Sequence, residues 1–267
     1  MDHLSQLENQ SIYLLREACQ GFKRLCMPWS MGKDSNVLIW LVKKATLGRL
    51  PFPLLHIDTT YEFPEMYEFR AWAVQHHGID LKVWINREAR ARGIGYETHD
   101  PVTVTHELKT VALQQAMAEH RWDGLITGIR RDEDATRAKE RYFSPRGSDF
   151  EWNYKDQPPE FWNQFILQPG PGGHVRIQPL LDWTELDIWL YIRREGIPIP
   201  QMYFARNGWR YRSLGCHPIT KPVASQAATI DDIIAELRQT RISERAGRAQ
   251  DHHERNAMQK LRARGFL

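Results

Sequence analysis

The sequence predicts an α/β fold in which a doubly wound, mostly parallel sheet is followed by a smaller C-terminal region of helices and loops. Short apolar runs alternate with longer segments of helical periodicity, an order typical of parallel strands joined by helices. A strand, a tight loop and a helix are expected within residues 25–45. The composition then changes at residues 131–173, which are rich in charge, Pro, Trp and Gly.

The first half of the chain is expected to supply most of the sheet. Apolar residues recur at near-helical spacing, which predicts helices, over residues 4–22, 36–45, 65–76 and 105–120. Compact apolar runs predict strands over residues 25–29, 53–58, 81–85 and 124–128.

The second half is less regular. Residues 131–173 are expected to form a long ordered loop region on the rim of the sheet, and residues 175–180 a short strand. Thr184 and Asp187 have the spacing of a capping box at a helix start. A last helix is expected over residues 230–237, and the polar tail that follows is rich in Arg. We place a domain boundary at residue 174/175, between an α/β domain (1–174) and a C-terminal region (175–267).

The composition excludes several classes of protein. The 267 residues are 42% hydrophobic and 26% charged with a net charge of +3, so neither a disordered chain nor a polybasic one is indicated. No apolar run is long enough for a membrane helix, and the N-terminus lacks the pattern of a signal peptide. Three scattered cysteines fit a reducing compartment and are too few for a four-cysteine iron–sulfur cluster. We therefore expect a soluble, cytoplasmic protein.

The segment Ser30-Met31-Gly32-Lys33-Asp34-Ser35 carries the clearest chemical signal. A loop between a strand and a helix presents backbone N–H groups and the positive end of the helix dipole to an anion. Gly32 allows close approach of a phosphate, Ser30 and Ser35 can donate hydrogen bonds, and Lys33 adds a positive charge. The alternative is an ordinary strand-to-helix turn.

Asp34 suits such a site only if a Mg²⁺ ion bridges it to the phosphates. A Walker A loop is excluded, because Met27 stands where its first Gly is required and Asp34 follows the Lys. The segment instead resembles the SGGxDS signature of the ATP pyrophosphatase (PP-loop) superfamily, with Met31 in place of one glycine.

Two further groups of polar residues follow predicted strands. Asp58 ends the second strand, where ligands gather in open α/β sheets, although helix caps and turns use such residues more often. Gly128 and Arg130 follow the strand at 124–128 and open a segment, 130–146, with six basic and four acidic residues. Guanidinium groups there could bind phosphate or sulfate, or the segment could be a solvated loop of internal ion pairs.

Blocks spread over the chain, in the same order, resemble the small catalytic subunit of bacterial sulfate adenylyltransferase. These blocks are residues 54–59, 65–70, 130–133, 137–141, 183–189, 213–216, 243–245 and 247–248. The resemblance implies a fold of the adenine nucleotide alpha hydrolase type, and the reaction of ATP with sulfate to give adenosine 5′-phosphosulfate and pyrophosphate.

The resemblance also implies roles for the residues singled out above. The β- and γ-phosphates and Mg²⁺ would be held by Ser30, Gly32, Lys33, Asp34 and Ser35. Asp58 would assist the nucleotide or metal, and Gly128 and Arg130 would lie along the adenosine or α-phosphate. Sulfate would be attracted by Arg131, Arg137 and Arg141.

Related enzymes couple this unfavourable reaction to GTP hydrolysis by a separate GTPase subunit, which we therefore expect as a partner; self-association is left open. Two departures bear on the assignment. The stretch between Tyr203 and Ser213 is shorter than in some members, and Cys216 has no assigned role. Cys216 is either a small buried apolar residue or a thiol activated by Arg212 or His217.

Three other functions compete. A phosphoadenylyl-sulfate reductase needs a reactive C-terminal cysteine, and no cysteine follows Cys216. An ATP pyrophosphatase of DNA phosphorothioation would work with a cysteine desulfurase and DNA, with Cys216 carrying persulfide and the Arg-rich tail near the polyanion. A non-enzymatic nucleotide sensor is the third. A zinc site at His76-His77 or His252-His253 is disfavoured, because adjacent residues seldom face one ion.

Overall fold

The computed structural model describes residues 2–152, 157, 159–240, 242, 244, 265 and 266. Its centre is a six-stranded sheet in the order β3-β2-β1-β4-β6-β5, in which only the edge strand β5 is antiparallel. The strands are β1 (Leu25–Pro28), β2 (Leu54–Ile57), β3 (Leu81–Trp84), β4 (Gly124–Ile126), β5 (Phe143–Arg146) and β6 (His174–Ile177). This confirms the α/β class and the mostly parallel sheet.

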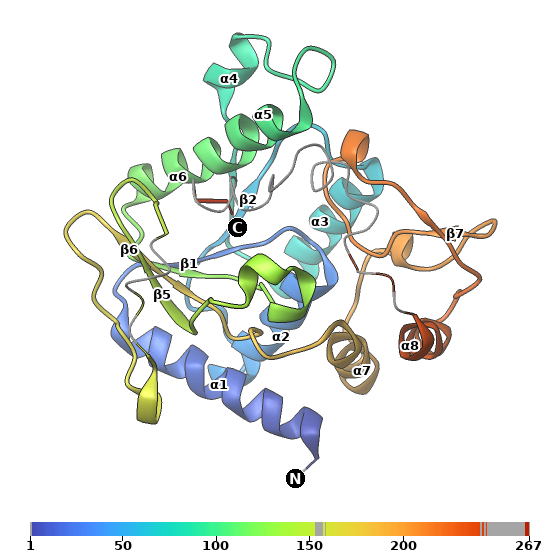
Figure 1. Cartoon of the computed structure of the whole chain (residues 1–267), viewed down its shortest axis with the longest axis horizontal. Helices are drawn as coiled ribbons and strands as arrows, with labels where there is room; N and C mark the ends of the chain where they lie inside the picture. Colours follow the sequence, from blue (N-terminus) through green and yellow to red (C-terminus); the bar gives the residue numbers. More distant parts are fainter. Residues whose placement is uncertain are drawn as a thin grey trace.

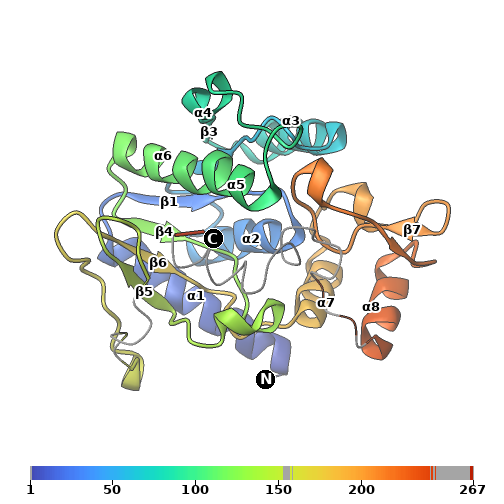
Figure 2. The same ribbon diagram turned by 45° about the horizontal axis from the view of Figure 1, so that its top comes forward.

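The helices cover both faces of this sheet. They are α1 (His3–Gly21), α2 (Lys33–Ala45), α3 (Pro64–His77), α4 (Arg87–Ala91), α5 (Pro101–Thr105), α6 (Ala112–His120), α7 (Glu185–Glu195) and α8 (Ile230–Gln239). A π-helical segment, His106–Val111, joins α5 to α6. Figure 2 shows α1 and α2 on one side of the sheet and α5 and α6 on the other.

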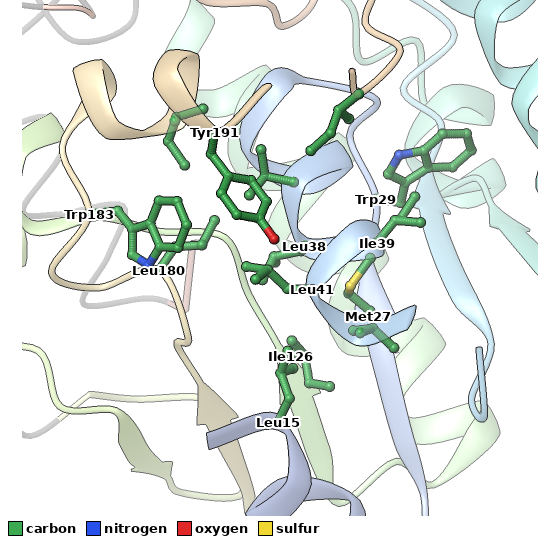
Figure 3. Close-up of a cluster of buried hydrophobic side chains, with 14 of the residues drawn as sticks. Leu15, Met27, Trp29, Leu38, Ile39, Leu41, Ile126, Leu180, Trp183 and Tyr191 are labelled. Carbon is green, nitrogen blue, oxygen red and sulfur yellow. The ribbon is translucent and has the colours of Figure 1, made fainter. Parts of the chain in front are cut away.

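The alternation of side chains along the strands builds two cores. Leu25 and Met27 of β1 belong to the larger core with α1, α2 and α7, whereas Cys26 between them packs with α6. Figure 3 shows the larger core, where Trp183 and Tyr191 meet Leu38 and Leu41 of α2. The Trp183 indole donates to Ser11 Oγ of α1 at 3.0 Å, so its polar atom is satisfied inside the core.

Some predicted elements end elsewhere in the structure, as β4 and β6 do at Ile126 and Ile177, and there are four larger differences. The helix expected over 105–120 begins earlier, at Pro101, because Asp100 caps it, and it contains the π segment. The prediction of an ordered loop region at 131–173 was wrong in part, because Phe143–Arg146 adds an edge strand to β6. The small hairpin of β7 (Trp209–Arg210) and β8 (Val223–Ala224), and the short helix α4, were not predicted.

The first residues of the C-terminal region belong to the central sheet, and the residues after them pack outside it. β6, which begins at His174, pairs with β4, and the chain then enters α7 through the capping box of Thr184 and Asp187, as expected. Figure 1 shows α7, the β7–β8 hairpin and α8 together at one end of the molecule. The division at residue 174/175 stays a prediction.

No helix in the described part of the chain is both long and apolar enough to cross a membrane.

Candidate active site

The sheet order places the carboxyl ends of β1 and β4 side by side. The strands β2 and β3, which follow β1 in the sequence, lie on one side of this pair, and β5 and β6, which follow β4, lie on the other. β1 is followed along the sheet by β2 on one side and β4 on the other. Open α/β sheets bind ligands outside the carboxyl ends of the strands at such a switch point. The segments that follow β1 and β4 are Ser30–Gly32 and Thr127–Arg130, which include most of the residues predicted to bind ATP.

The loop after β1 is held in one conformation by its neighbours. Asn36 of α2 donates to the Met31 carbonyl at 3.0 Å and accepts from the Trp29 indole at 2.9 Å. Ser35 Oγ donates to the Gly32 carbonyl at 3.0 Å. The helix begins at Lys33, so Lys33, Asp34 and Ser35 form its first turn.

Gly32 is needed at the start of this helix for space. A Cβ atom there would lie 3.3 Å from both Ser30 Oγ and the Tyr203 hydroxyl. The same hydroxyl accepts from the Lys33 backbone N–H at 2.9 Å, so Tyr203 occupies one of the free donors of the helix N-terminus. Gly128 is less constrained, because a Cβ there would lie 3.3 Å from the end of the Leu38 side chain and at an ordinary contact distance, 3.6 Å, from the Asp34 Cβ.

A cavity of about 250 Å³ opens at this switch point. It is lined by side chains from the loop after β1, the ends of β2 and β4, the π segment, and the C-terminal region. The polar ones include Ser30, Lys33, Asp34, Ser35, His56, Glu62, Lys109, Thr110, Thr127, Glu133, Arg137, Tyr203, Ser213 and Glu244.

Apart from atoms of Asp34 and Arg137, whose side chains form ion pairs, three buried polar atoms in this lining have no hydrogen-bond partner in the described part of the molecule. They are His56 Nε2, Thr110 Oγ1 and Thr127 Oγ1. Burial lowers the pKa of His56 below its usual value, so its imidazole is neutral near pH 7. Because buried polar groups are nearly always hydrogen-bonded, these three atoms point to a polar ligand in the cavity.

A charge cluster lies at the end of the cavity beside the loop at residues 30–35. Arg130 is fully buried. Its Nη1 forms an ion pair with Asp34 and a second one, at 3.4 Å, with Glu133. Its Nε meets Asp132 at 2.9 Å. The carboxylate of Glu244 forms ion pairs with both Arg130 Nη2 and Lys33 Nζ.

These contacts balance the charges inside the protein. Burial alone would raise the pKa of Glu244, but Arg130 and Lys33 outweigh it and hold that pKa well below its usual range. Burial, and then the charge of Glu244, raise the pKa of the Glu185 carboxyl. Lys33 and Arg130 are thus neutralised by carboxylates of the chain itself.

The residues predicted to attract sulfate are not all at the cavity. Arg137 lines it, is nearly fully buried and pairs with Glu133. Arg131 pairs with Asp182 and stacks over the Tyr142 ring at 5.7 Å, and neither it nor Arg141 lines the cavity.

Asp58 is also outside the lining of the cavity. Its carboxylate accepts from the Thr60 backbone N–H and the Tyr67 hydroxyl, each at 2.8 Å, and pairs with Arg70 at 3.1 Å. Burial raises its pKa, but these bonds lower it more, so the net shift is downward. In the structure Asp58 fixes the turn after β2, while His56 and Ile57 reach the cavity.

Sequence reasoning missed several residues that the fold brings to the cavity. Tyr203, Thr127 and Glu244 were not assigned a role, and Glu244 appeared only within a block of the family resemblance. A capped helix start, as at Thr184, can be recognised from residues within one turn. Tyr203, Thr127 and Glu244 instead reach the cavity from distant parts of the chain, so no local sequence pattern marks them.

Cys216 is fully buried, with its sulfur 3.2 Å from Thr59 Oγ1, and does not line the cavity. The described residues contain no group of three or more His, Cys, Asp and Glu side chains that could hold a metal ion. His252 and His253, and Ser243, Arg245, Gly247 and Arg248 of the family-like block, lie outside the described residues, as does most of the Arg-rich tail.

Residues 24–222 match the family model of the phosphoadenosine phosphosulfate reductase domain. The chain is 42% identical to a sulfate adenylyltransferase subunit 2 of Alkalilimnicola ehrlichii over 295 aligned positions, covering 99% of this chain and 94% of the relative. It is 40% identical to sulfate adenylyltransferase subunit 2 of Pseudomonas syringae pv. syringae over 301 positions, covering 100% and 99%.

Solved structures share the fold at low identity. A phosphoadenylyl-sulfate reductase from Candida auris, in a phosphate complex, superposes with a TM-score of 0.56 at 17% identity, covering 84% of this chain and 97% of that one. The FMN adenylyltransferase of Candida glabrata in complex with ATP gives a TM-score of 0.52 at 16% identity, covering 83% and 65%.

Proposed function

Because the chain belongs to the family of sulfate adenylyltransferase subunit 2, we propose that it transfers the adenylyl group of ATP to sulfate together with a GTPase subunit. It is a nucleotidyltransferase whose substrate is ATP. A sulfate oxygen attacks the α-phosphorus, the bond from that phosphorus to the bridging oxygen breaks, and pyrophosphate leaves with the electron pair. The protein aligns the groups and compensates charge.

The observation that carries this proposal is the convergence of two kinds of group on one cavity. The first turn of α2, with Lys33 and Ser35, supplies positive potential and donors for the β- and γ-phosphates. The unpartnered atoms of His56, Thr110 and Thr127 supply hydrogen bonds for a nucleoside. A position for an anion next to a position for a nucleoside is what a nucleotide requires of its binding site.

Mg²⁺ fits the residues present. Asp34 and Glu133 both line the cavity and both approach Arg130 Nη1, so their carboxylates converge. Mg²⁺ in nucleotide sites is commonly bound by one or two carboxylates together with substrate phosphates. We propose that Asp34, with Glu133 near it, holds this ion, which would neutralise charge on the phosphates.

For sulfate, Arg137 is the strongest of the three predicted arginines, because it alone lines the cavity. Its guanidinium pairs with Glu133, so a Glu133 carboxylate that turned toward Mg²⁺ would let Arg137 contact an oxyanion. Arg131 and Arg141 lie outside the lining, and we give them no direct contact with sulfate.

We infer a separate GTPase subunit because the product anhydride is high in energy and this chain has no Walker A loop of its own. The relatives are named as one subunit of an enzyme. Three scattered cysteines favour a reducing compartment, so we also propose that the enzyme works in the cytoplasm. The phosphorothioation alternative needs an accessible thiol, whereas Cys216 is fully buried.

The test is a substrate-resolved assay. The protein is incubated with ATP and Mg²⁺, with and without sulfate, alone and with its companion subunit and GTP, and both adenosine 5′-phosphosulfate and pyrophosphate are measured. Sulfate-dependent formation of both products is expected. Pyrophosphate release that ignores sulfate, with no phosphosulfate under any condition, would overturn the proposal.

A variant pair tests the metal assignment in the same assay. Asp34→Asn is expected to lower kcat/KM by about 10²-fold and to raise the Mg²⁺ concentration needed for half-maximal rate. Asp231→Asn, on the exposed face of α8, is the matched control and should behave as the parent protein. Full activity of Asp34→Asn at low Mg²⁺ would refute the role of Asp34.

A further inference from the structure

A second concave surface shares the residue Glu62 with the cavity. It is a groove of about 1440 Å³ between α3 and the segment that runs from Ile197 to Tyr211. Figure 1 shows α3 and this C-terminal segment on the same side of the molecule. α3 has 14 residues, so it offers a wall of about 20 Å.

The groove is apolar and exposes aromatic rings. Trp72 of α3 is 42% exposed and Trp209 of β7 is 54% exposed, although most Trp side chains are largely buried. Phe69 and Phe204 line the groove between them. An exposed aromatic surface of this size marks an interaction site more often than free surface.

The α3 wall of the groove is negatively charged. Glu65 and Glu68 are exposed on the face of α3 that also carries Trp72, at helical spacing, and Glu62 lies just before the helix. Within the part of the chain that the structure describes, none of these three carboxylates forms an ion pair. Arg206 and His217 also line the groove, from segments outside α3. The unpaired carboxylates of the α3 wall, beside exposed aromatic rings, suit a partner that brings both apolar and basic side chains.

The groove is also connected to the candidate active site. Glu62 lines both the groove and the cavity. Met202 and Phe204 line the groove, and Tyr203 between them holds the first backbone N–H of α2. An occupant of the groove would therefore contact the chain segment that positions the phosphate loop.

We propose that this groove is the docking site of the companion subunit, which binds it with a segment of apolar or aromatic side chains flanked by Lys or Arg. This inference rests on the proposed function only in requiring a companion subunit. It does not depend on sulfate being the acceptor, because the contact is between proteins.

The experiment measures binding rather than turnover. The full chain and the companion subunit of sulfate adenylyltransferase from the same organism are purified separately, and their affinity is measured by calorimetry at low and at high salt. The double variant Glu65→Lys/Glu68→Lys is expected to weaken binding about tenfold or more, and more strongly at low salt. Trp209→Ala is expected to weaken it about tenfold at both salt concentrations.

Matched variants elsewhere on the surface are the controls. Glu88→Lys/Glu119→Lys reverses two exposed charges on α4 and α6, and Leu47→Ala removes an apolar side chain that is 85% exposed. Both should bind as the parent does. Circular dichroism and thermal melting of each variant establish that it is folded.

Three outcomes would overturn the inference. The companion subunit could bind all groove variants as tightly as the parent chain. The control variants could weaken binding as much as the groove variants. Light scattering could show that the isolated chain self-associates and that only this association is lost in the groove variants, which would make the occupant a second copy. A chain that binds its companion through the groove but makes no phosphosulfate would refute the proposed function alone.

Discussion

At the residue scale, Met31 shows how this phosphate loop departs from its family pattern. Met31 stands where the SGGxDS signature has a glycine, and its backbone has φ of 61°, in the left-handed region that favours glycine. Its side chain is fully buried in the larger core. The backbone cost of about 1–2 kcal/mol is offset by about 1.5–3 kcal/mol from burying the side chain.

This balance predicts an unusual order of stability among two variants. Met31→Ala loses the packing of the side chain beyond Cβ and keeps the strained backbone, whereas Met31→Gly also loses Cβ but relieves the strain. We expect Met31→Gly to be at least as stable as Met31→Ala in urea unfolding. At Met27, in the regular strand β1, the Gly variant should instead be less stable than the Ala variant by about 1 kcal/mol. The same order at both positions would contradict this explanation.

Glu244 is the second residue with a measurable consequence. Its carboxylate neutralises Lys33, which lines the cavity, and Arg130, which is fully buried next to it. Bound phosphates would present the same negative charge to the same cations. The carboxylate and the phosphates therefore satisfy one requirement, which is compensation of buried positive charge.

We predict that Glu244→Ala is less stable than the parent without ligand, by up to about 3 kcal/mol, because Arg130 keeps three other carboxylates. The difference in melting temperature should shrink when pyrophosphate and Mg²⁺ are added. Glu236→Ala is the control, since Glu236 pairs with the fully buried Arg210 away from the cavity. Its loss of stability should not depend on pyrophosphate. An equal, ligand-independent loss at both positions would count against the role of Glu244.

At the scale of elements, prediction succeeded where a pattern is local. The start of α7 could be read from Thr184 and Asp187, because a capping box lies within one helical turn. β5 could not, because Phe143–Arg146 is a short strand that contains Pro145 and is defined by pairing with β6 almost thirty residues later in the chain. The candidate site divides in the same way: the loop at 30–35 is a contiguous motif, whereas Tyr203 and Glu244 reach it by tertiary contact.

The contact of α3 with α2 makes stability depend on pH. His77, in the last turn of α3, has its Nδ1 3.3 Å from Lys43 Nζ and packs edge-on against Trp40. Burial, and then the charge of Lys43, lower the pKa of His77 to about 4. The ordinary value is near 6.5, so the unfolded chain binds this proton more readily than the folded one.

The stabilisation that depends on a neutral His77 is therefore fully present above about pH 6.5 and is lost as the pH falls toward 4. Because His77 is only partly buried and water screens its charge, we expect an effect of less than about 2 kcal/mol. His77→Gln should flatten the dependence of unfolding free energy on pH between 4 and 6.5. Lys43→Met should move the midpoint of that dependence upward, because the neighbouring positive charge is gone. A His77→Gln protein with an unchanged pH profile would show that other groups dominate.

At the scale of the whole molecule, the C-terminal region completes a site that the α/β sheet only begins. Tyr203, Ser213 and Glu244 all follow residue 174, and all line a cavity whose phosphate loop lies in the first 35 residues. Tyr203 is held in place by an edge-on contact of its ring with Trp189 of α7, at 5.5 Å. Its hydroxyl is thus a fixed link from α7 to the first turn of α2.

Tyr203→Phe removes this link and keeps the packing of the ring. The loss of one hydrogen bond to the Lys33 N–H is worth about 0.5–1.5 kcal/mol, so we predict ATP affinity about 2- to 10-fold weaker in calorimetry. Tyr13→Phe, with a partly exposed ring on α1, is the control and should leave the affinity unchanged. If the hydroxyl only blocks the helix N-terminus, Tyr203→Phe would bind ATP more tightly. Tighter or unchanged binding would therefore refute the view that the C-terminal region positions the phosphate loop for ATP.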